Sequence, residues 1–326
     1  MILQYDKQYM EGIIDLWNKE AVKLGYKEMN QAGFTRIFLE NPYFSEKLTW
    51  VMQEEEKIVG FACGCVGDEL PLGKTSGYIT CIVLDEKYET AENYRVFMDL
   101  LEKAFLSEEK IYSELLFFNP MMLPWYIKGT EQHEHNNAPG VFKSSRFYRE
   151  LLSCGYEERT TECAMYLNLE YFAIPEKINE KERKAAEGGY EVSLFDKNRH
   201  YDLEEMLCKL ENPLWEKEIS QAAQDGIPVL IAAQNGRAVG FAGPISRQES
   251  GRGYFTGIGV NKEHEGHGLG TILFYKLCRE EKNAGARYMS LYTGATNPAA
   301  RIYLQAGFQI VEEFAVMRKI LKPLDK

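Results

Sequence analysis

The chain has 326 residues, of which 45% are hydrophobic and 27% charged, and its formal net charge is −11. This length suits two domains of about 150 residues each, and the apolar content is ample for two cores. The acidic balance argues against general nucleic-acid binding, which needs a basic face, and weakly favours cationic ligands such as amines.

The sequence predicts a cytoplasmic protein without a membrane segment or a metal. Met1–Lys7 lacks the charged segment and apolar core of a signal peptide, and no apolar run reaches the ~18–20 residues of a membrane span. The seven cysteines follow no metal-ligand spacing. Cys63 and Cys65 lie in a strand pattern and are expected to be buried thiols. His133 and His135 lack a third ligand, so we expect a solvated loop there.

In chain order, the first half opens with a predicted strand at Ile2–Tyr5 and a helix around Tyr9–Lys23. Three of its later segments recur in the second half. These pairs are Lys57–Ala62 with Arg237–Ala242, Gly77–Leu84 with Gly253–Val260, and Cys154–Tyr156 with Ala306–Phe308. The offset is 176 residues at the tyrosine pair Tyr78 and Tyr254, but 152 at Gly155 and Gly307. A repeat this long is a duplicated domain, and the first copy carries about 24 extra residues, placed within Asn119–Val141.

A charged stretch separates the two copies. Residues 171–189 contain a proline, many charges and a terminal Gly-Gly, as linkers do, although part of the stretch could be helical. We therefore predict a first domain at 1–170, a linker at 171–189 and a second domain at 190–326.

The second half shows the order of an α+β sandwich around a mixed, mostly antiparallel sheet. Asn235-Gly236 is a strong hairpin signal between two apolar runs. The predicted elements are a strand at Tyr190–Leu194, helices near Tyr201–Leu210 and Leu214–Gln224, the hairpin Val229–Ala233 and Ala238–Ala242, strands at Tyr254–Val260 and Tyr288–Tyr292, a short helix from Asn297, and a final pair at Phe308–Val311 and Phe314–Ile320.

A glycine loop follows the strand that ends at Val260. Gly266, Gly268 and Gly270 alternate in a polar loop that leads into an amphipathic helix. Several backbone N–H groups can converge at such a helix start, which suits a pyrophosphate. The pattern is neither the Rossmann fingerprint nor a P-loop. A merely tight strand-to-helix turn is the alternative.

A second segment follows about thirty residues later. Asn297 is placed to cap a short helix that Gly307 closes. Together the two segments resemble the acetyl-CoA-binding core of the GNAT acyltransferase superfamily. Its N-x-x-A-x-x-x-Y-x-x-x-G-F pattern is matched at Asn297, Ala300, Tyr303, Gly307 and Phe308. Its Q/R-x-x-G-x-G/A pattern is matched at Gly268 and Gly270, with Glu265 in place of Arg or Gln.

The resemblance implies a tandem GNAT protein whose second half binds acetyl-CoA. It implies that the strand residues Ile258, Gly259 and Val260 pair with the pantetheine arm, that Asn297 contacts that arm, and that Tyr303 protonates the departing thiolate. The pyrophosphate would lie on the loop residues Gly266, His267, Gly268, Leu269, Gly270 and Thr271. Capping alone could explain Asn297, and core packing could explain Tyr303.

Two further points concern the reacting centre. Gly257 and Gly259 would clear space beside the reacting atoms, although packing could also explain them. The general base is unassigned, and Glu216, Glu218 and Glu249 are candidates without a spacing argument.

The first copy is expected to have lost this site. Tyr88–Tyr94, opposite the glycine loop, contains no glycine and two carboxylates, and Leu151 stands opposite Tyr303. The expected activity is acetyl-CoA-dependent N-acetylation of a primary amine on a small molecule or peptide. The alternatives are a silent CoA-binding sensor or interaction module, and an enzyme with another acyl donor or acceptor. The oligomeric state is open.

Overall fold

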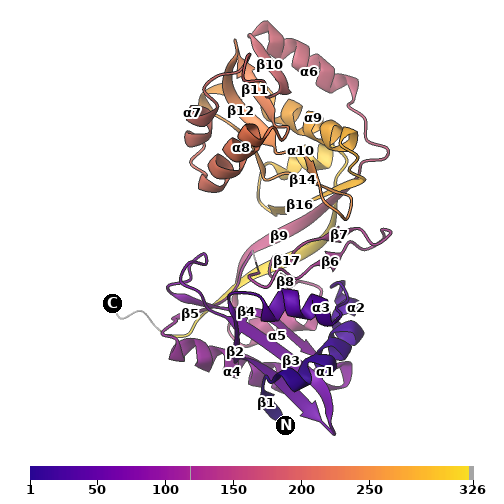
Figure 1. Cartoon of the computed structure of the whole chain (residues 1–326), viewed down its shortest axis with the longest axis vertical. Coiled ribbons are helices and arrows are strands. Elements are labelled where there is room, and N and C mark those ends of the chain that lie inside the picture. Colours follow the sequence, from indigo (N-terminus) through magenta and orange to yellow (C-terminus); the bar gives the residue numbers. More distant parts are fainter. Residues whose placement is uncertain (118, 323–326) are drawn as a thin grey trace. The chain divides into compact units, whose positions relative to one another are not determined.

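The computed structural model describes residues 1–117 and 119–322, which form two compact units (Figure 1). The first contains Met1–Ala164, Tyr292–Asn297 and the C-terminal stretch from Ile310. The second contains Met165–Leu291 and Pro298–Gln309. Compactness thus groups the last strand with the first unit, whereas the predicted boundaries follow the duplication. Residues 323–326 of the predicted second domain lie outside the described residues.

The first unit is built on one sheet with the strand order β1-β2-β3-β4-β5-β17-β9. Neighbouring strands from β1 to β4 are antiparallel, β4 and β5 are parallel, and β17 is antiparallel to both β5 and the short β8. The strands are β1 (Ile2–Gln4), β2 (Phe44–Glu54), β3 (Lys57–Cys65), β4 (Ser76–Leu84), β5 (Tyr112–Leu115), β8 (Val141–Phe142), β9 (Glu157–Asn168) and β17 (Gln309–Ile320).

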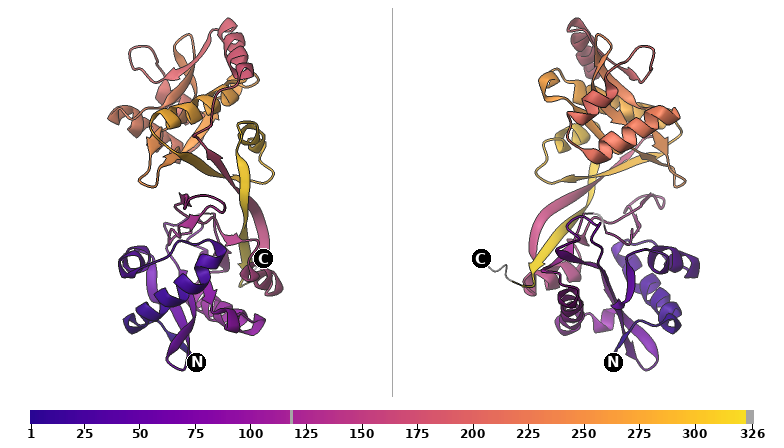
Figure 2. Two further views of the ribbon diagram at one scale, coloured as in Figure 1. Left: turned by 90° about the vertical axis from the view of Figure 1, so that its right-hand side faces the viewer. Right: turned by 60° about the vertical axis from the view of Figure 1, so that its left-hand side comes forward.

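Helices cover both faces of this sheet (Figure 2). Phe61 of β3 packs on Phe34 and Phe38, with ring centroids 6.3 and 5.5 Å apart, so one face meets α3 and η3. On the other face, a Cβ atom on Gly60 would lie 2.9 Å from Phe97 of α4. The helices are η1 (Lys7–Tyr9), α1 (Met10–Leu16), η2 (Trp17–Ala21), α2 (Val22–Leu24), α3 (Gln31–Phe34), η3 (Thr35–Leu39), η4 (Glu86–Tyr88), α4 (Ala91–Ser107) and α5 (Arg146–Ser153). The helix predicted around Tyr9–Lys23 is confirmed, with a π-helical turn, η2, inside it.

The extra segment of the first copy is part of the core of this unit. Its strands β6 (Trp125–Tyr126) and β7 (Glu134–His135) form a small hairpin. The Trp125 indole donates a hydrogen bond to the Tyr292 hydroxyl at 2.7 Å, and the His135 ring lies 4.1 Å from the Tyr292 ring. His135 is only 5% exposed, so the solvated-loop interpretation is wrong for this residue. Tyr292 lies far from His135 in the sequence, and Trp125 faces it only because the hairpin forms.

The second unit contains a four-stranded antiparallel sheet with the order β10-β11-β12-β15. Its strands are β10 (Tyr190–Leu194), β11 (Leu230–Gln234), β12 (Arg237–Gly243) and β15 (Gly257–Val260), and β13 (Ser246–Arg247), β14 (Arg252–Tyr254) and β16 (Tyr288–Gly294) form a neighbouring group. Its helices are α6 (Glu176–Glu187), α7 (Leu203–Cys208), α8 (Pro213–Asp225), η5 (Lys262–His264), α9 (Leu269–Asn283) and α10 (Ala300–Gln305). The α+β class and the mixed, mostly antiparallel pairing agree with the prediction.

Three local predictions were wrong. The run Tyr254–Val260 is two strands, β14 and β15, because the chain leaves one strand group for the other at Phe255 and Thr256. The final pair of strands is the single strand β17, since nothing between Val311 and Phe314 favours a turn. Asn297 does not cap α10, whose N-cap is Ala299 and has no side-chain cap. Left-handed backbone at Asn235 (φ 50°) and Gly236 (φ 86°) confirms the hairpin turn.

The duplication is visible in one packing position. In the first unit, a Cβ atom on Gly77 would lie 2.3 Å from the Phe105 ring of α4. At the same offset in the second unit, a Cβ atom on Gly253 would lie 2.9 Å from Glu281 of α9. Each strand glycine makes room for a helix side chain, which is apolar in one copy and acidic in the other.

Glu281 is a fully buried carboxyl with incomplete hydrogen bonding. Its Oε1 accepts a 3.3 Å hydrogen bond from the Ser246 N–H, and among the described residues its Oε2 accepts none. Burial raises its pKa from the ordinary 4.5 to about 8. The folded state therefore binds the proton more tightly than the unfolded chain does. This stabilisation is fully present below about pH 4.5 and is lost as the pH rises through about 8.

We therefore expect Glu281→Gln to be more stable than the parent protein at alkaline pH. The glutamine keeps an acceptor for the Ser246 N–H and cannot ionise. The difference in free energy of unfolding should grow by up to about 1.4 kcal/mol per pH unit between about pH 5 and 8. Urea midpoints at several pH values measure it, with Glu280→Gln on the same helix as the control. A difference that does not change with pH would contradict the prediction.

Candidate cofactor and catalytic site

The site begins where the chain passes from β14 to β15 and changes its strand partner. β14 pairs in parallel with β16, at Arg252 with Tyr288 and at Gly253 with Met289. β15 pairs with β12 instead, and within the described chain it has no strand on its other side. One edge of β15 therefore presents backbone N–H and C=O groups that an extended ligand can pair with.

A cavity of about 480 Å³ lies beside this edge. Its volume falls within the range of about 300–1,000 Å³ that is typical of small-molecule sites. Strand β15, the glycine loop, the start of α9 and helix α10 all contribute to its walls. The lining residues are Ile258, Gly259, Val260, His264, Glu265, Gly266, Gly268, Leu269, Gly270, Thr271, Phe274, Ala299, Ile302 and Tyr303. Of the predicted site residues, the structure brings all but His267 and Asn297 to this lining.

The glycine loop adopts a backbone that demands glycine and leaves room for a ligand. Gly266 and Gly268 have φ values of 83° and 76°, in the left-handed region. No atom lies within 4 Å of a Cβ placed on Gly266 or Gly270. Gly268 is the N-cap of α9 and offers no side chain to the first helical N–H groups. Those donors and the positive end of the helix dipole are thus available to an anion.

Tyr303 lies at the cavity wall and in the core at once. Its ring packs on Phe274 and Phe308, with centroids 4.7 and 6.2 Å away, and the residue is 9% exposed. In the described part of the chain, its hydroxyl has no hydrogen-bond partner. Burial raises the pKa of the phenol, so the phenol stays protonated at neutral pH. A proton donor therefore borders the cavity.

The charges around the loop include one residue that the sequence analysis missed. Glu265 is exposed and borders the cavity. His264 Nδ1 lies 3.0 Å from the Tyr190 hydroxyl, and the His267 ring packs on Tyr190 at 4.7 Å. A Cβ on Gly268 would lie 3.9 Å from Cδ of Lys181, on α6. Lys181 belongs to the stretch predicted as a linker, and only its partial helicity hinted that folding could bring it to the loop.

Packing accounts for the two glycines of β15. A Cβ on Gly257 would lie 2.4 Å from Nε1 of Trp215, and one on Gly259 would lie 2.8 Å from Cδ1 of Leu210. The Trp215 indole also donates a 3.2 Å hydrogen bond to the Thr256 carbonyl. The glycines therefore let the segment around α8 lie directly on the strand.

The three carboxylates considered as bases lie in different surroundings. Glu216 and Glu249 are exposed. Glu218 is half-buried and accepts a 3.2 Å hydrogen bond from the Tyr254 hydroxyl, at the end of β14 where the chain changes partners. Burial raises the pKa of Tyr254. Glu218 is thus the one of the three that contacts the strand leading into the site.

Asn297 makes no contribution to the cavity lining. Its backbone N–H donates a 2.9 Å hydrogen bond to the Gly294 carbonyl. The helix that follows is closed by Gly307, with φ 100°, as predicted. The match at Asn297 therefore identifies the segment, while the cavity uses Ala299, Ile302 and Tyr303 from it.

Two observations bear on metals and membranes. Among residues 1–117 and 119–322, no three His, Cys, Asp or Glu side chains are grouped so that they could hold a metal ion. Over the same residues, no helix combines the length and apolarity that crossing a membrane requires.

Comparisons with known proteins agree with this geometry. Residues 195–308 match the acetyltransferase (GNAT) family. No curated protein sequence matches the chain. The fold resembles the GCN5-related N-acetyltransferase from Sphaerobacter thermophilus, with a TM-score of 0.63, 12% identity and coverage of 99% of this chain and 96% of that one. It also resembles a tandem GNAT protein from the clavulanic acid biosynthesis pathway, with a TM-score of 0.55, 13% identity and coverage of 100% and 99%.

A fungal multi-domain GH3 β-N-acetylglucosaminidase contains a similar region, described as a GCN5-related glucosamine N-acetyltransferase region. The TM-score is 0.65 at 14% identity, and the match covers 98% of this chain but spans only 38% of the fungal one. At such low identities these likenesses establish the fold, while the family match establishes the acetyltransferase domain. Residues 195–308 therefore form a domain of the acetyltransferase (GNAT) family, and the chain as a whole shares its fold with a tandem GNAT protein.

Proposed function

We propose that this protein transfers the acetyl group of acetyl-CoA to a primary amine of a small molecule or peptide, in its second half. The observation that carries the proposal is the single cavity that joins the uncapped start of α9, the unpaired edge of β15 and Tyr303. These are an anion site, a backbone edge for the amides of the pantetheine arm, and a proton donor. An extended thioester cofactor requires all three.

The residues divide the work of the transfer. Backbone N–H groups from Gly266 to Thr271 would hold the pyrophosphate, and a β15 N–H would polarise the thioester carbonyl. The free amine attacks the carbonyl carbon, and the C–S bond breaks as the carbonyl re-forms. Tyr303 gives its proton to the departing thiolate, and the ammonium product of the attack loses its proton to water or a carboxylate. Tyr303 at the cavity favours this activity over a silent CoA sensor, for which a buried proton donor has no use.

Gly270 allows a test of cofactor binding that should not disturb the fold. Gly270 is helical, and a Cβ there meets no atom within 4 Å, so Gly270→Val should fold normally. Its side chain would stand where the phosphates approach, and we expect the KM for acetyl-CoA to rise at least about tenfold, a loss of about 1.4 kcal/mol of binding. Steady-state kinetics and calorimetry measure this. Ala284→Val, at the other end of α9, is the control, and unchanged acetyl-CoA affinity in a folded Gly270→Val protein would remove the loop from the site.

Tyr303→Phe tests the general acid. The ring and its packing on Phe274 remain, and only the hydroxyl is lost. Turnover should fall by about 10²–10⁴-fold, the usual contribution of general acid catalysis, with little change in acetyl-CoA affinity. Tyr201→Phe, at an exposed tyrosine, should leave turnover unchanged. Near-normal turnover in Tyr303→Phe would exclude the role, and a lowered melting temperature without a turnover defect would assign Tyr303 to packing alone.

We expect Lys181 to supply a positive charge beside the loop, where Glu265 stands in place of the Arg or Gln of the family pattern. Lys181→Gln should raise the KM for acetyl-CoA a fewfold, because an exposed charge contributes up to about 1 kcal/mol to such an interaction. The effect should shrink with added salt, and Lys181→Arg should restore the affinity. Equal KM values for the Gln and Arg variants at low salt would show that this lysine does not meet the cofactor.

A further inference from the structure

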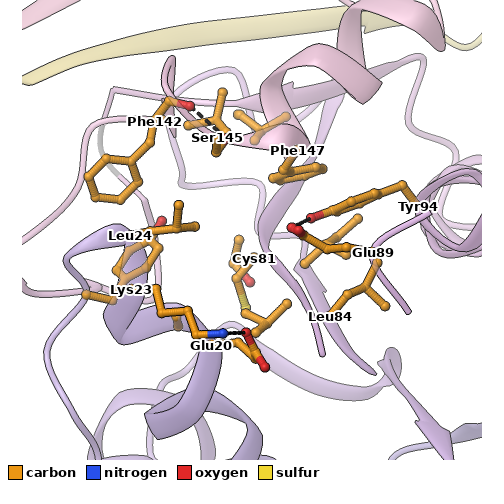
Figure 3. Close-up of a pocket in the computed structure, with 18 of the residues that line it drawn as sticks. Glu20, Lys23, Leu24, Cys81, Leu84, Glu89, Tyr94, Phe142, Ser145 and Phe147 are labelled. Carbon is orange, nitrogen blue, oxygen red and sulfur yellow. Dashed lines mark hydrogen bonds and ion pairs between the residues drawn. The ribbon is translucent and has the colours of Figure 1, made fainter. Parts of the chain in front are cut away.

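The first unit contains a cavity at the position that corresponds to the cofactor cavity of the second. Its volume is about 330 Å³, and its walls come from the second half of β4, from η2 and α2, from the start of α4, and from β8 and α5 (Figure 3). In the duplication, the second half of β4 corresponds to β15, α4 to α9 and α5 to α10. The duplicated fold has thus kept a cavity where the cofactor motif is absent.

The start of α4, which corresponds to the anion-binding start of α9, is already occupied by side chains of this chain. Thr90 caps α4, its Oγ1 accepting a 3.2 Å hydrogen bond from the Asn93 N–H. The Glu89 carboxylate lies at the same helix start and accepts a 2.7 Å hydrogen bond from the Tyr94 hydroxyl. A helix start that already carries a cap and a carboxylate repels a pyrophosphate. This cavity therefore cannot hold CoA in the manner proposed for the second unit.

The remaining walls are largely apolar. Leu24, Leu84, Val141, Phe142 and Phe147 line them. Phe147 and Tyr94 stack with ring centroids 5.5 Å apart and planes 9° from parallel, so this part of the wall is aromatic. A concave, largely apolar space with a few polar groups is typical of a small-molecule site.

The charged groups of the cavity are mostly acidic, and one of the carboxylates forms no ion pair among the described residues. Lys23 forms ion pairs with Glu20 and Glu86, whose carboxylate oxygens lie 2.7 and 3.0 Å from its Nζ. Glu20 is 8% exposed. Burial is the largest single influence on the pKa of its carboxyl and raises it, but the hydrogen bonds from Lys23 and Lys19 together outweigh burial, so the pKa is lowered. Glu89 is half-buried, and within the described residues it forms no ion pair and has only the neutral Tyr94 hydroxyl as a donor. A partly desolvated carboxylate without a cation favours a cationic ligand.

We propose that this cavity binds a small apolar molecule that carries a protonated amine, with its body against Leu24, Phe142 and Phe147 and its ammonium group on Glu89. In Figure 3 Glu89 stands on one side of the space, and Leu24 and Phe142 stand on the other. The site is distinct from the acetyl-transfer site and does not depend on it. The degenerate copy thus acts as a receptor for an apolar amine.

Calorimetry on the full-length protein with two probes of equal shape tests the proposal. Phenylbutylamine and phenylbutanol differ only in their terminal ammonium and hydroxyl groups, so the amine should bind at least about tenfold more tightly, because it alone brings a positive charge to the Glu89 carboxylate. Glu89→Gln keeps an acceptor for the Tyr94 hydroxyl and removes the charge, and it should abolish the preference for the amine. Glu92→Gln makes the same charge change at an exposed position on α4 and should leave the preference intact.

A blocking variant separates this site from an amine acceptor site in the second half. Leu24→Trp fills the cavity from its wall and should abolish binding of both probes, while acetyl transfer and acetyl-CoA affinity stay unchanged. Circular dichroism and a melting curve check that the variant is folded, and Glu89→Gln gives an independent answer if it is not. Equal affinity for the two probes, an amine preference that survives Glu89→Gln, or probe binding that survives in folded Leu24→Trp would each overturn the proposal.

Discussion

The functional architecture depends on one change of strand partner, at Phe255 and Thr256. If β14 and β15 were one straight strand, β16 would continue to pair with it, and the edge of β15 would be occupied by protein backbone. The break sends β15 to β12 alone and frees that edge within the described chain. The glycine loop and the uncapped α9 then follow directly from the free strand, so the backbone groups that a ligand needs are left unpaired together.

Local sequence signals predicted the elements and most of the cavity, because their chemistry is itself local. The hairpin at Asn235-Gly236, the left-handed glycines and the helix that Gly307 closes depend on the backbone preferences of a few neighbouring residues. The break after Tyr254 could not be predicted, since both pieces are apolar and β-prone and only tertiary pairing divides them. Lys181 beside Gly268 and His135 beside Tyr292 depend on contacts between residues far apart in the sequence, which periodicity does not encode.

The two copies show how one packing scheme can serve different chemistry. Gly77 and Gly253 both make room for a helix residue, yet Phe105 fills that space with apolar surface and Glu281 fills it with a carboxyl that burial keeps largely protonated at neutral pH. At the helix starts the contrast is reversed. Thr90 and Glu89 occupy the start of α4, whereas Gly268 leaves the start of α9 open. Folding needs the strand glycine in both copies, while the helix caps decide which copy can accept an anion.

Because folding and anion binding depend on different residues, the degenerate first copy can keep a cavity after it has lost the anion site. The elements that frame the space between β4 and α5 correspond to those that frame the space between β15 and α10, so removing this space from the fold would require those elements to move closer together. Replacing a few loop residues is a smaller change, and it suffices to turn an anion site into an acidic one. A duplicated fold therefore retains the shape of a binding site after the original ligand is excluded, and the charge at its mouth selects the next one. In this chain that charge is Glu89, and the ligand it selects is a cation.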